Sequence, residues 1–313
     1  MRIGIDLGGT KIEGIVLDDT GAVRFRERRA TPRGDYDGTI EALVDLVAAA
    51  EMAIGHTATV GIGMPGAISP ATGMVKNANS TWLIGRTLDR DLEARLGRPV
   101  RLANDANCFA LSEASDGAAA GAPVVFGVIV GTGCGGGVVV HGHVLTGPNA
   151  IAGEWGHNPL PWPAADELPG PECYCGKRGC LETYLSGPGL ARDYAACAGV
   201  DPTKIKGATV VACAAAGDRH AIAALDRYAH RLARGLATVI NTIDPDVIVL
   251  GGGVSNVTML YDAVPRWLDQ FVFSDHVATR IVPPMHGDSS GVRGAAWLWP
   301  QGHQATGLES PGR

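Results

Sequence analysis

Residues 2–18 read RIGIDLGGTKIEGIVLD, two apolar stretches joined at the glycine pair Gly8-Gly9. The β-branched and apolar residues on both sides of the glycines predict a hairpin with a tight turn. The pattern recurs at residues 124–141, VVFGVIVGTGCGGGVVVH, again as strand, glycine-rich turn and strand. Two such hairpins in one chain predict an internally duplicated α/β architecture with a nucleotide held between its halves.

Glycine-rich turns offer backbone N–H groups to phosphate oxygens, and a nearby carboxylate can hold Mg²⁺. Asp6 lies two residues before the first turn. A third turn, Gly251-Gly252-Gly253, follows an apolar strand and precedes a helix expected from about residue 257. This turn could face an adenosine or a phosphate, although many such turns only relieve crowding.

Two common nucleotide-binding signatures do not apply to this chain. Gly131, Gly133 and Gly136 fit G-x-G-x-x-G, but that fingerprint requires a helix after the turn, and Val138 continues a strand. The Walker pattern G-x-x-x-x-G-K-[ST] is absent from the sequence. The sequence therefore argues against a Rossmann dinucleotide domain and against a P-loop NTPase.

Asp105 stands where a strand at 100–102 gives way to a helix. Its plain interpretation is a helix N-cap, a position that Asp fills often. Its functional interpretation is a general base, because a helix N-terminus keeps a carboxylate ionised and ready to accept a proton from a substrate hydroxyl. We favour the base, since phosphate-type turns and a polyol-type wall accompany it. Gly66 and the amide of Asn79, in the polar loop 77–82, are further candidates for sugar contacts.

Residues 153–182 read GEWGHNPLPWPAADELPGPECYCGKRGCLE and are too rich in Pro and Gly to form a helix or a strand. Four side chains in this stretch suit a closed tetrahedral zinc site. They are Cys173, Cys175 and Cys180, in C-x-C-x4-C spacing, and His157 upstream. The alternative is a disulfide pair with a spare thiol, which no secretory signal supports. A metal here would hold Glu154, His157 and Glu182 in fixed relation, as a rigid wall of a binding site.

The bulk composition bounds the class of protein. The chain has 313 residues, 46% of them hydrophobic and 19% charged, which is enough for two domains with cores. A net charge of −6 gives no support for a nucleic-acid or membrane partner. The sequence has no secretory signal and no apolar run of membrane-spanning length. Seven cysteines without an export signal indicate a reducing compartment, so we expect a cytoplasmic protein.

Taken together, the motifs resemble those of the ROK family of sugar kinases over nearly the whole chain. They are DLGGTK (Asp6–Lys11), LANDAN (Leu102–Asn107), GTGCGGG (Gly131–Gly137), GEWGH (Gly153–His157), CYCGKRGCLE (Cys173–Glu182) and LGGG (Leu250–Gly253). The resemblance implies an α/β, ribonuclease-H-like actin–hexokinase fold with two α/β lobes around a central cleft. We expect an N-terminal lobe over 1–117, a C-terminal lobe over 118–300 and a flexible tail over 301–313. The C-terminal helix near 290–299 is expected to pack back on the N-terminal lobe.

The resemblance also implies roles for the matching residues, with Asp105 as the catalytic base. With Gly66 and Asn79 added, the expected sugar contacts are Gly66, Asn79, Asn104, Asp105, Glu154, His157 and Glu182. The residues expected to bind ATP and Mg²⁺ are Asp6, Gly8, Gly9, Thr10, Lys11, Gly131, Thr132, Gly133, Gly251, Gly252 and Gly253. The implied zinc ligands are His157, Cys173, Cys175 and Cys180. His157 would direct one ring nitrogen to zinc and the other to the sugar.

Within the family, three segments look most like the bacterial fructokinase (manno-fructokinase) branch: GEWGHNPLPW (153–162), CYCGKRGC (173–180) and HGDSSGVRGAAWLWP (286–300). We therefore expect ATP-dependent phosphorylation of the 6-hydroxyl of D-fructose, with mannose as a further substrate. The alternatives are an N-acetylglucosamine kinase or a glucokinase of the same family. A non-catalytic sugar-sensing regulator is the alternative of another class, but such relatives carry an N-terminal helix-turn-helix, and here the first hairpin begins at residue 2. The family default is a homodimer.

Overall fold

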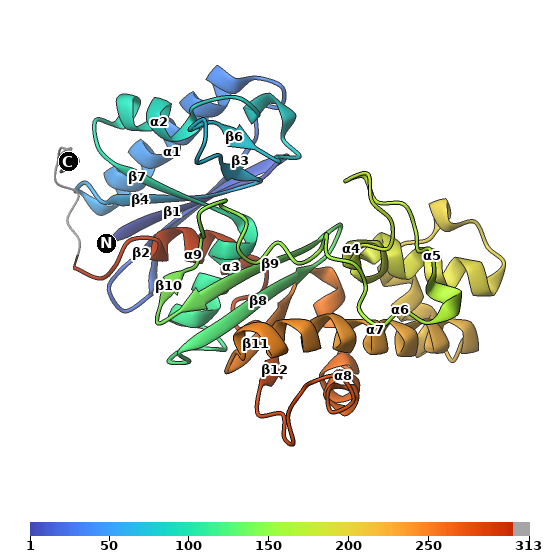
Figure 1. Ribbon diagram of the computed structural model, residues 1–313. Helices are drawn as coiled ribbons and strands as arrows, with labels where there is room; N and C mark the ends of the chain where they lie inside the picture. Colours follow the sequence, from blue (N-terminus) through green and yellow to red (C-terminus); the bar gives the residue numbers. More distant parts are fainter. Residues whose placement is uncertain (303–313) are drawn as a thin grey trace. The chain divides into compact units, whose positions relative to one another are not determined.

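The computed structural model of the protein describes residues 1–302 and divides into two compact units (Figure 1). Unit 1 comprises Met1–Ala120, Gly142–Ala152 and the segment that begins at Asp288, and unit 2 comprises Gly121–His141 and Gly153–Gly287. The C-terminal helix packs on the sheet of unit 1, and residues Gly142–Ala152, which lie within the expected C-terminal lobe over 118–300, also belong to unit 1. The expected tail over 301–313 lies, after residue 302, outside the described residues.

The sheet of unit 1 has the strand order β3-β2-β1-β4-β7 (Figure 1). Its strands are β1 (Arg2–Leu7), β2 (Lys11–Leu17), β3 (Val23–Ala30), β4 (Thr59–Met64) and β7 (Val100–Asn104). The unit also contains α1 (Tyr36–Ile54), α2 (Leu88–Leu96), α3 (Asp105–Ser115), α9 (Ser290–Trp297) and the short strands β5 (Ala67–Ile68), β6 (Val75–Lys76) and β10 (His143–Val144). β1 and β2 form the predicted antiparallel hairpin, whereas β1, β4 and β7 run parallel. The carboxyl ends of β1 and β7 therefore meet at one edge of the sheet, which brings Asp6 and Asp105 to that edge.

Strand β3 was not anticipated from the sequence. Its residues, VRFRERRA, are mostly charged, and the strand forms the edge of the sheet. Two of its arginines, Arg26 and Arg28, pair with Glu13 on β2, whose side chain is only 2% exposed. The Glu13 carboxylate accepts hydrogen bonds from Arg26 Nε at 2.6 Å and from Arg28 Nε at 2.7 Å. A basic strand is stable here because a buried carboxylate on the neighbouring strand pairs with it, and its charges discourage pairing with a further strand.

Helix α9 packs against β4 and α3 at backbone contact distance. A Cβ atom built on Gly61 of β4 would lie 1.9 Å from the carbonyl oxygen of Ala295. A Cβ atom on Gly294 of α9 would lie 1.6 Å from the carbonyl oxygen of Cys108 in α3. Both positions therefore require glycine. The close packing holds α3 against the sheet and so fixes the two elements that carry the candidate carboxylates.

The sheet of unit 2 contains strands in the order β9-β8-β11-β12. These strands are β8 (Val124–Val130), β9 (Cys134–Val140), β11 (Val247–Gly251) and β12 (Arg280–Val282). The helices of the unit are α4 (Leu181–Leu185), α5 (Gly187–Ala198), α6 (Gly207–Ala215), α7 (Arg219–Ile243) and α8 (Leu260–Leu268). β8 and β9 form the second predicted hairpin, and β11 runs parallel to β8. One apolar core joins these strands to the buried face of the long helix α7.

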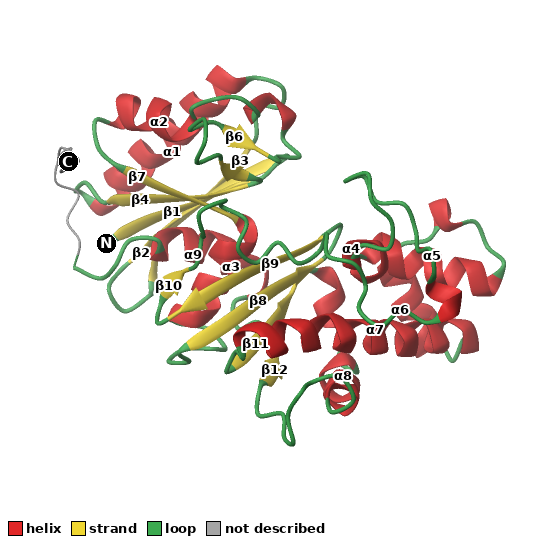
Figure 2. Cartoon of the chain, viewed as in Figure 1, coloured by secondary structure: helices red, strands yellow, loops and turns green. Residues whose placement is uncertain are grey.

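Residues 153–180 of unit 2 form a long loop, as their Pro and Gly content predicts, with a single 3-10 turn inside it (Figure 2). The prediction of a loop over 153–182 is wrong for its last two residues, because α4 begins at Leu181. The first residues of the loop pack against β9. Trp155 Nε1 donates a hydrogen bond to the Gly135 carbonyl at 3.0 Å. A Cβ atom on Gly136 would lie 2.7 Å from the carbonyl oxygen of Gly153. The glycines that continue β9 after its turn therefore serve close backbone packing of the loop.

Candidate functional site

Asp6 and Asp105 are the acidic residues at the sheet edge of unit 1. Asp6 is half-buried near the end of β1, and burial raises its pKa to about 6, with the negative charge of Asp105 as the next cause. The Asp105 side chain is open to solvent at the first position of α3, but the protein around it raises its pKa by desolvation. Asp105 Oδ1 accepts a hydrogen bond from the Ala106 N–H at 2.8 Å, which partly offsets that effect. Raised pKa values in neighbouring acids are typical of groups that accept protons or hold cations.

The N-cap of α3 is Asn104, so the plain interpretation of Asp105 as the helix cap is wrong. Asn104 Oδ1 accepts a hydrogen bond from the Asn107 N–H at 2.7 Å. Both residue types are good caps, and the sequence could not decide between neighbours. Because Asn104 takes the capping role, the second carboxylate oxygen of Asp105 is left to other chemistry.

The turn between β1 and β2 is closed by a hydrogen bond from the Gly8 N–H to the Lys11 carbonyl at 3.0 Å. Thr31 supports this turn: its hydroxyl donates to the Gly8 carbonyl at 2.7 Å and its N–H donates to the Thr10 carbonyl at 3.1 Å. Gly9 is half-buried, whereas Thr10 and Lys11 are exposed. The turn is therefore rigid in its backbone and presents the Thr10 and Lys11 side chains to solvent.

The two other residues of unit 1 that the sequence proposed for sugar binding occupy different surroundings. Gly66 has φ 77°, and a Cβ atom there would lie 2.2 Å from the Lys76 carbonyl oxygen. Gly66 is therefore required by the close approach of β5 and β6, whatever else it does. Asn79 is exposed in the loop that follows β6.

The second and third glycine turns meet in unit 2, at a cavity of about 590 Å³. Gly131 and Thr132, from the β8–β9 turn, and Gly253, after β11, line it. Its other walls are mainly apolar and come from α5, α6 and the segment before α6, through Leu190, Ala191, Ile205 and Val211. A pocket of this size with mainly apolar walls is typical of a small-molecule site.

The described residues that line this cavity do not include Gly251 or Gly252. Gly251 ends β11, and Gly252 has φ 81°, with a Cβ position only 2.5 Å from the Val130 carbonyl oxygen. The alternative that such a turn relieves crowding therefore holds for Gly252, while Gly253 faces the cavity. A 3-10 turn over Gly253–Asn256 follows, so α8 begins at Leu260 rather than near residue 257.

Gly133 provides room for Glu182. The Cys134 N–H donates a hydrogen bond to Glu182 Oε2 at 3.0 Å, and a Cβ atom on Gly133 would lie 2.7 Å from the same oxygen. The Glu182 N–H donates in turn to the Gly156 carbonyl at 2.8 Å. A residue expected to bind sugar and a turn expected to bind phosphate are thus in direct contact.

The structure brings the four candidate metal ligands together. The ligand atoms of His157, Cys173, Cys175 and Cys180 all lie within 4.8 Å of one another. His157 Nδ1 is 3.5 Å from Cys173 Sγ, and Cys175 Sγ is 3.6 Å from Cys180 Sγ. In a tetrahedral zinc site with bonds of about 2.1 to 2.3 Å, ligand atoms lie about 3.5 to 3.8 Å apart. The donor set fits zinc, and the three thiols are free rather than paired in a disulfide.

The other ring nitrogen of His157 faces Tyr174. Nε2 lies 3.0 Å from the tyrosine hydroxyl oxygen, and the rings meet edge-on with their centroids 5.1 Å apart. Burial, followed by the negative charge of Glu182, raises the pKa of Tyr174. Sequence reasoning missed this residue, although its place between Cys173 and Cys175 was a usable signal, because a residue between two metal ligands is held close to the site.

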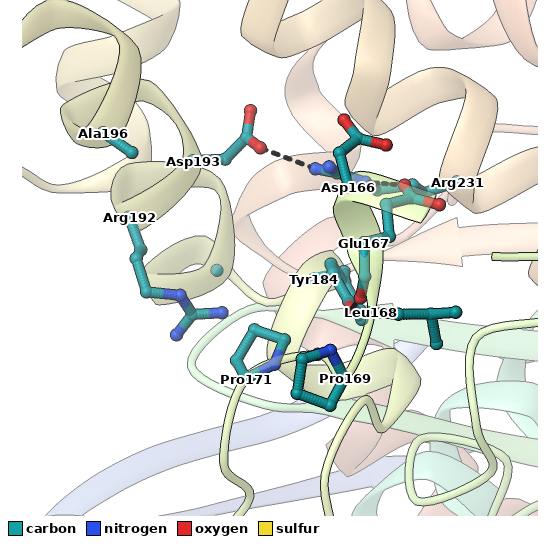
Figure 3. A pocket seen from close by; sticks show the side chains of 12 residues that line it. Asp166, Glu167, Leu168, Pro169, Pro171, Tyr184, Arg192, Asp193, Ala196 and Arg231 are labelled. Carbon is teal, nitrogen blue, oxygen red and sulfur yellow. Dashed lines mark hydrogen bonds and ion pairs between the residues drawn. The ribbon is translucent and has the colours of Figure 1, made fainter. Parts of the chain in front are cut away.

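Buried ion pairs anchor the proline-rich part of the loop to α5 and α7 (Figure 3). Glu167 Oε1 accepts hydrogen bonds from Arg231 Nε and from Arg234, each at 2.7 Å. Arg231 also donates to Asp193 at 2.8 Å. Burial opposes ionisation of Glu167, but the hydrogen bonds from the two arginines outweigh it and lower its pKa to about 2. The cavity beside these pairs, about 370 Å³, is lined by none of the residues predicted to form the site.

Within residues 1–302, no helix is both long and apolar enough to cross a membrane.

The sequence profile of the ROK family matches residues 2–302. The chain is 41% identical to an N-acetyl-D-glucosamine kinase of Photobacterium profundum, over 95% of this chain and 99% of that protein. It is 40% identical to an N-acetyl-D-glucosamine kinase of Pasteurella multocida, over 96% of this chain and 99% of that protein.

Solved structures of similar chains share the fold. A ROK hexokinase from Thermus thermophilus superposes with a TM-score of 0.83 at 32% identity, over 95% of this chain and 97% of that chain. A ROK family glucokinase from Streptomyces griseus, solved with glucose and AMPPNP, gives a TM-score of 0.73 at 30% identity, over 96% of this chain and 99% of that chain. These similarities confirm the predicted α/β, actin–hexokinase-like fold class.

Proposed function

The chain belongs to the ROK family, and on that premise we propose that it is an ATP-dependent N-acetyl-D-glucosamine kinase. The observation that carries the proposal is the similarity, over almost its whole length, to relatives that bear this name. The shared fold and the cavity formed by two glycine turns in unit 2 support the broader assignment as a sugar kinase.

The prediction of a fructokinase is wrong. The relatives at about 40% identity are N-acetyl-D-glucosamine kinases, the alternative within the same family. Two of the three segments that favoured the fructokinase branch, 153–162 and 286–300, include residues that the fold itself requires. Gly153 packs against β9 and Gly294 against α3. Such positions report backbone packing, which says little about the sugar.

In the proposed reaction, the cavity of unit 2 binds the nucleotide. Its apolar walls suit an adenine ring, and the N–H groups around Thr132 and Gly253 suit phosphate oxygens. Mg²⁺, bound with ATP, would supply charge neutralisation at the phosphates. Asp6 is the residue that would hold it. Burial and the charge of Asp105 raise the pKa of Asp6, and a divalent cation would remove that penalty.

Asp105 acts as the general base in this proposal. It would orient the 6-hydroxyl of the sugar and accept its proton while the hydroxyl oxygen forms the bond to the γ-phosphorus and ADP leaves. Its raised pKa makes it a better proton acceptor than an ordinary exposed aspartate. Asn104 caps α3 and holds the start of that helix in place.

The sugar would be bound in unit 2 by Glu154, His157 and Glu182. Glu182 accepts a hydrogen bond from the Cys134 N–H, and His157 belongs to the Cys/His cluster, so both side chains have fixed positions. We propose that the cluster binds structural zinc, which would fix the loop that carries these side chains. The test of this part is a metal analysis of the purified protein, in which one zinc per chain is expected.

The proposal is tested by an ADP-release assay with Mg²⁺-ATP and a panel of N-acetylglucosamine, glucose, mannose and fructose. We expect the highest kcat/KM for N-acetylglucosamine, with phosphate found on the 6-oxygen by NMR of the product. A clear preference for another sugar would overturn the substrate and keep the kinase. No turnover with any of the four by zinc-replete protein would overturn the kinase itself.

The variant Asp105→Asn tests the base. We expect kcat to fall by about 10² to 10⁴, as is typical for loss of a general base, while the affinity for the sugar stays within about threefold. Turnover close to that of the unmodified protein would remove Asp105 from this role. The homodimer expected by resemblance remains a proposal, for which light scattering of the eluted protein should give twice the mass of one chain.

A further inference from the structure

The Tyr174 hydroxyl contacts the ring nitrogen of His157 that the proposed function assigns to the sugar. The Tyr174 side chain is 84% exposed, yet its hydroxyl oxygen lies 3.0 Å from His157 Nε2. The only ring against it in the described structure is that of His157, in an edge-on arrangement at 86°. Other tyrosines of unit 2 are built differently: Tyr228 is 1% exposed and its hydroxyl donates to the Leu185 carbonyl at 2.7 Å. Tyr174 is therefore a surface side chain that makes one specific polar contact.

The proton of the His157 ring identifies the donor in this contact. Nδ1 faces Cys173 Sγ at 3.5 Å, inside the group of four ligand atoms. A neutral imidazole that offers Nδ1 to a metal carries its single proton on Nε2. With a metal at Nδ1, the Nε2–H group donates to the Tyr174 oxygen, 3.0 Å away. One N–H group makes one strong hydrogen bond, so the tyrosine oxygen and a sugar oxygen compete for the same donor.

We infer that Tyr174 occupies the sugar's hydrogen bond to His157 when no sugar is bound, and that its side chain turns away when the sugar binds. The inference rests on the proposed function in one respect, that the sugar contacts His157 Nε2. It assigns to Tyr174 the role of a positioning residue that sets the affinity for the sugar.

The Tyr174 side chain can rotate while the backbone of the loop stays in place. The Cys173 N–H donates to the Lys177 carbonyl at 2.8 Å, and the Gly176 N–H donates to the Cys173 carbonyl at 3.0 Å. These bonds hold the backbone on both sides of the tyrosine. Because the side chain is so exposed, turning it costs the hydrogen bond to His157 and one edge contact, and little buried surface.

The variant Tyr174→Phe tests the inference, because it keeps the ring and removes the competing oxygen. A net hydrogen bond of ordinary strength corresponds to a factor of about 2 to 10 in an equilibrium constant. We expect the Kd of the sugar, measured by titration calorimetry on zinc-replete protein without nucleotide, to fall by that factor. The KM for the sugar should fall in parallel, while kcat stays within about twofold.

Tyr194→Phe is the matched control. Tyr194 also lies in unit 2, and its hydroxyl donates to Asp218 Oδ2 at 2.9 Å, in a contact between α5 and the start of α7. Removing this hydroxyl is expected to lower stability and to leave the Kd of the sugar unchanged. The control thus separates a general effect of losing a phenol oxygen from the specific effect at His157.

Three results would overturn the inference. A higher Kd for the sugar in Tyr174→Phe would mean that the phenol contacts the sugar, and an unchanged Kd would mean that it does not compete. Loss of zinc from Tyr174→Phe would mean that the tyrosine supports the metal site. The comparison is made with whichever sugar the protein binds best in the panel. Preference for a sugar other than N-acetylglucosamine would therefore overturn the proposed substrate and leave this test intact.

Discussion

Replacing Glu167 by Gln tests whether buried ion pairs hold the long loop of unit 2 against α7. The Glu167 side chain is 8% exposed, and its two arginine partners, Arg231 and Arg234, are 9% and 2% exposed. The amide keeps the shape of the carboxylate but removes its charge. Its NH₂ group would also face the Ala164 N–H, which now donates to Glu167 Oε2 at 2.9 Å.

The expected cost follows from the contacts of this carboxylate. Its pKa falls from 4.5 to about 2, which corresponds to about 3 kcal/mol in favour of the charged form. Part of this is recovered in the variant, because Arg231 keeps its bond to Asp193 at 2.8 Å and Arg234 keeps its bond to the Trp162 carbonyl at 2.6 Å. We therefore expect Glu167→Gln to lower the free energy of unfolding by about 2 to 3 kcal/mol at pH 7.

The effect depends on pH in a defined direction. A carboxyl group whose pKa is lower in the folded protein stabilises it above the unfolded pKa, and this stabilisation is lost as the pH falls through the folded pKa. The difference between the two proteins should therefore be constant above about pH 5 and shrink as the pH falls from 4.5 toward about 2.

The assay is urea unfolding of both proteins at a series of pH values, followed by tryptophan fluorescence. The control is Glu172→Gln in the same loop, where the carboxylate is 81% exposed and pairs with Arg178 at 2.7 Å. An exposed pair of this kind contributes little, so a change below about 0.5 kcal/mol is expected. Equal unfolding midpoints for Glu167→Gln and the unmodified protein at pH 7 would refute the reasoning. So would a difference that stays constant down to pH 3.

Three further outcomes are expected. Asp6→Asn should stabilise the folded protein at pH 7 by up to about 3 kcal/mol and so raise its thermal midpoint. Because the pKa of Asp6 is raised to about 6 in the folded protein, the stability of the unmodified protein falls as the pH rises from about 4 to 6, and a midpoint without this pH dependence would contradict the assignment. Cys175→Ser should lose zinc and stability together, whereas Cys197→Ser, at an exposed thiol outside the cluster, should lose neither; metal analysis and thermal melts decide. Gly294→Ala should destabilise unit 1 by more than about 3 kcal/mol, because its Cβ would lie 1.6 Å from the Cys108 carbonyl oxygen, and a soluble variant with an unchanged melting midpoint would exclude the close contact.

Much of the framework follows from local patterns in the sequence. Both glycine hairpins are present where the sequence predicts them. The spacing of the cysteines and His157 predicted a cluster that the structure brings together within 4.8 Å. These features depend on neighbours along the chain, on side-chain periodicity and on turn residues, so they are readable without knowledge of distant contacts.

The tertiary structure alone decided which distant groups share a site and what each glycine does. Glu182 fills the space left by Gly133, and Tyr174 takes the free nitrogen of His157. Glu13 makes an arginine-rich strand stable. In each case the stabilising contact is made with a partner that is remote in sequence, or depends on the absence of a side chain where two segments pack closely. A local pattern records which side chain or glycine is present, but not the atom that it meets. The preferred sugar was mispredicted for the same reason, because motifs shared across a family record the packing of its fold, whereas the sugar is chosen by side chains that only folding brings together.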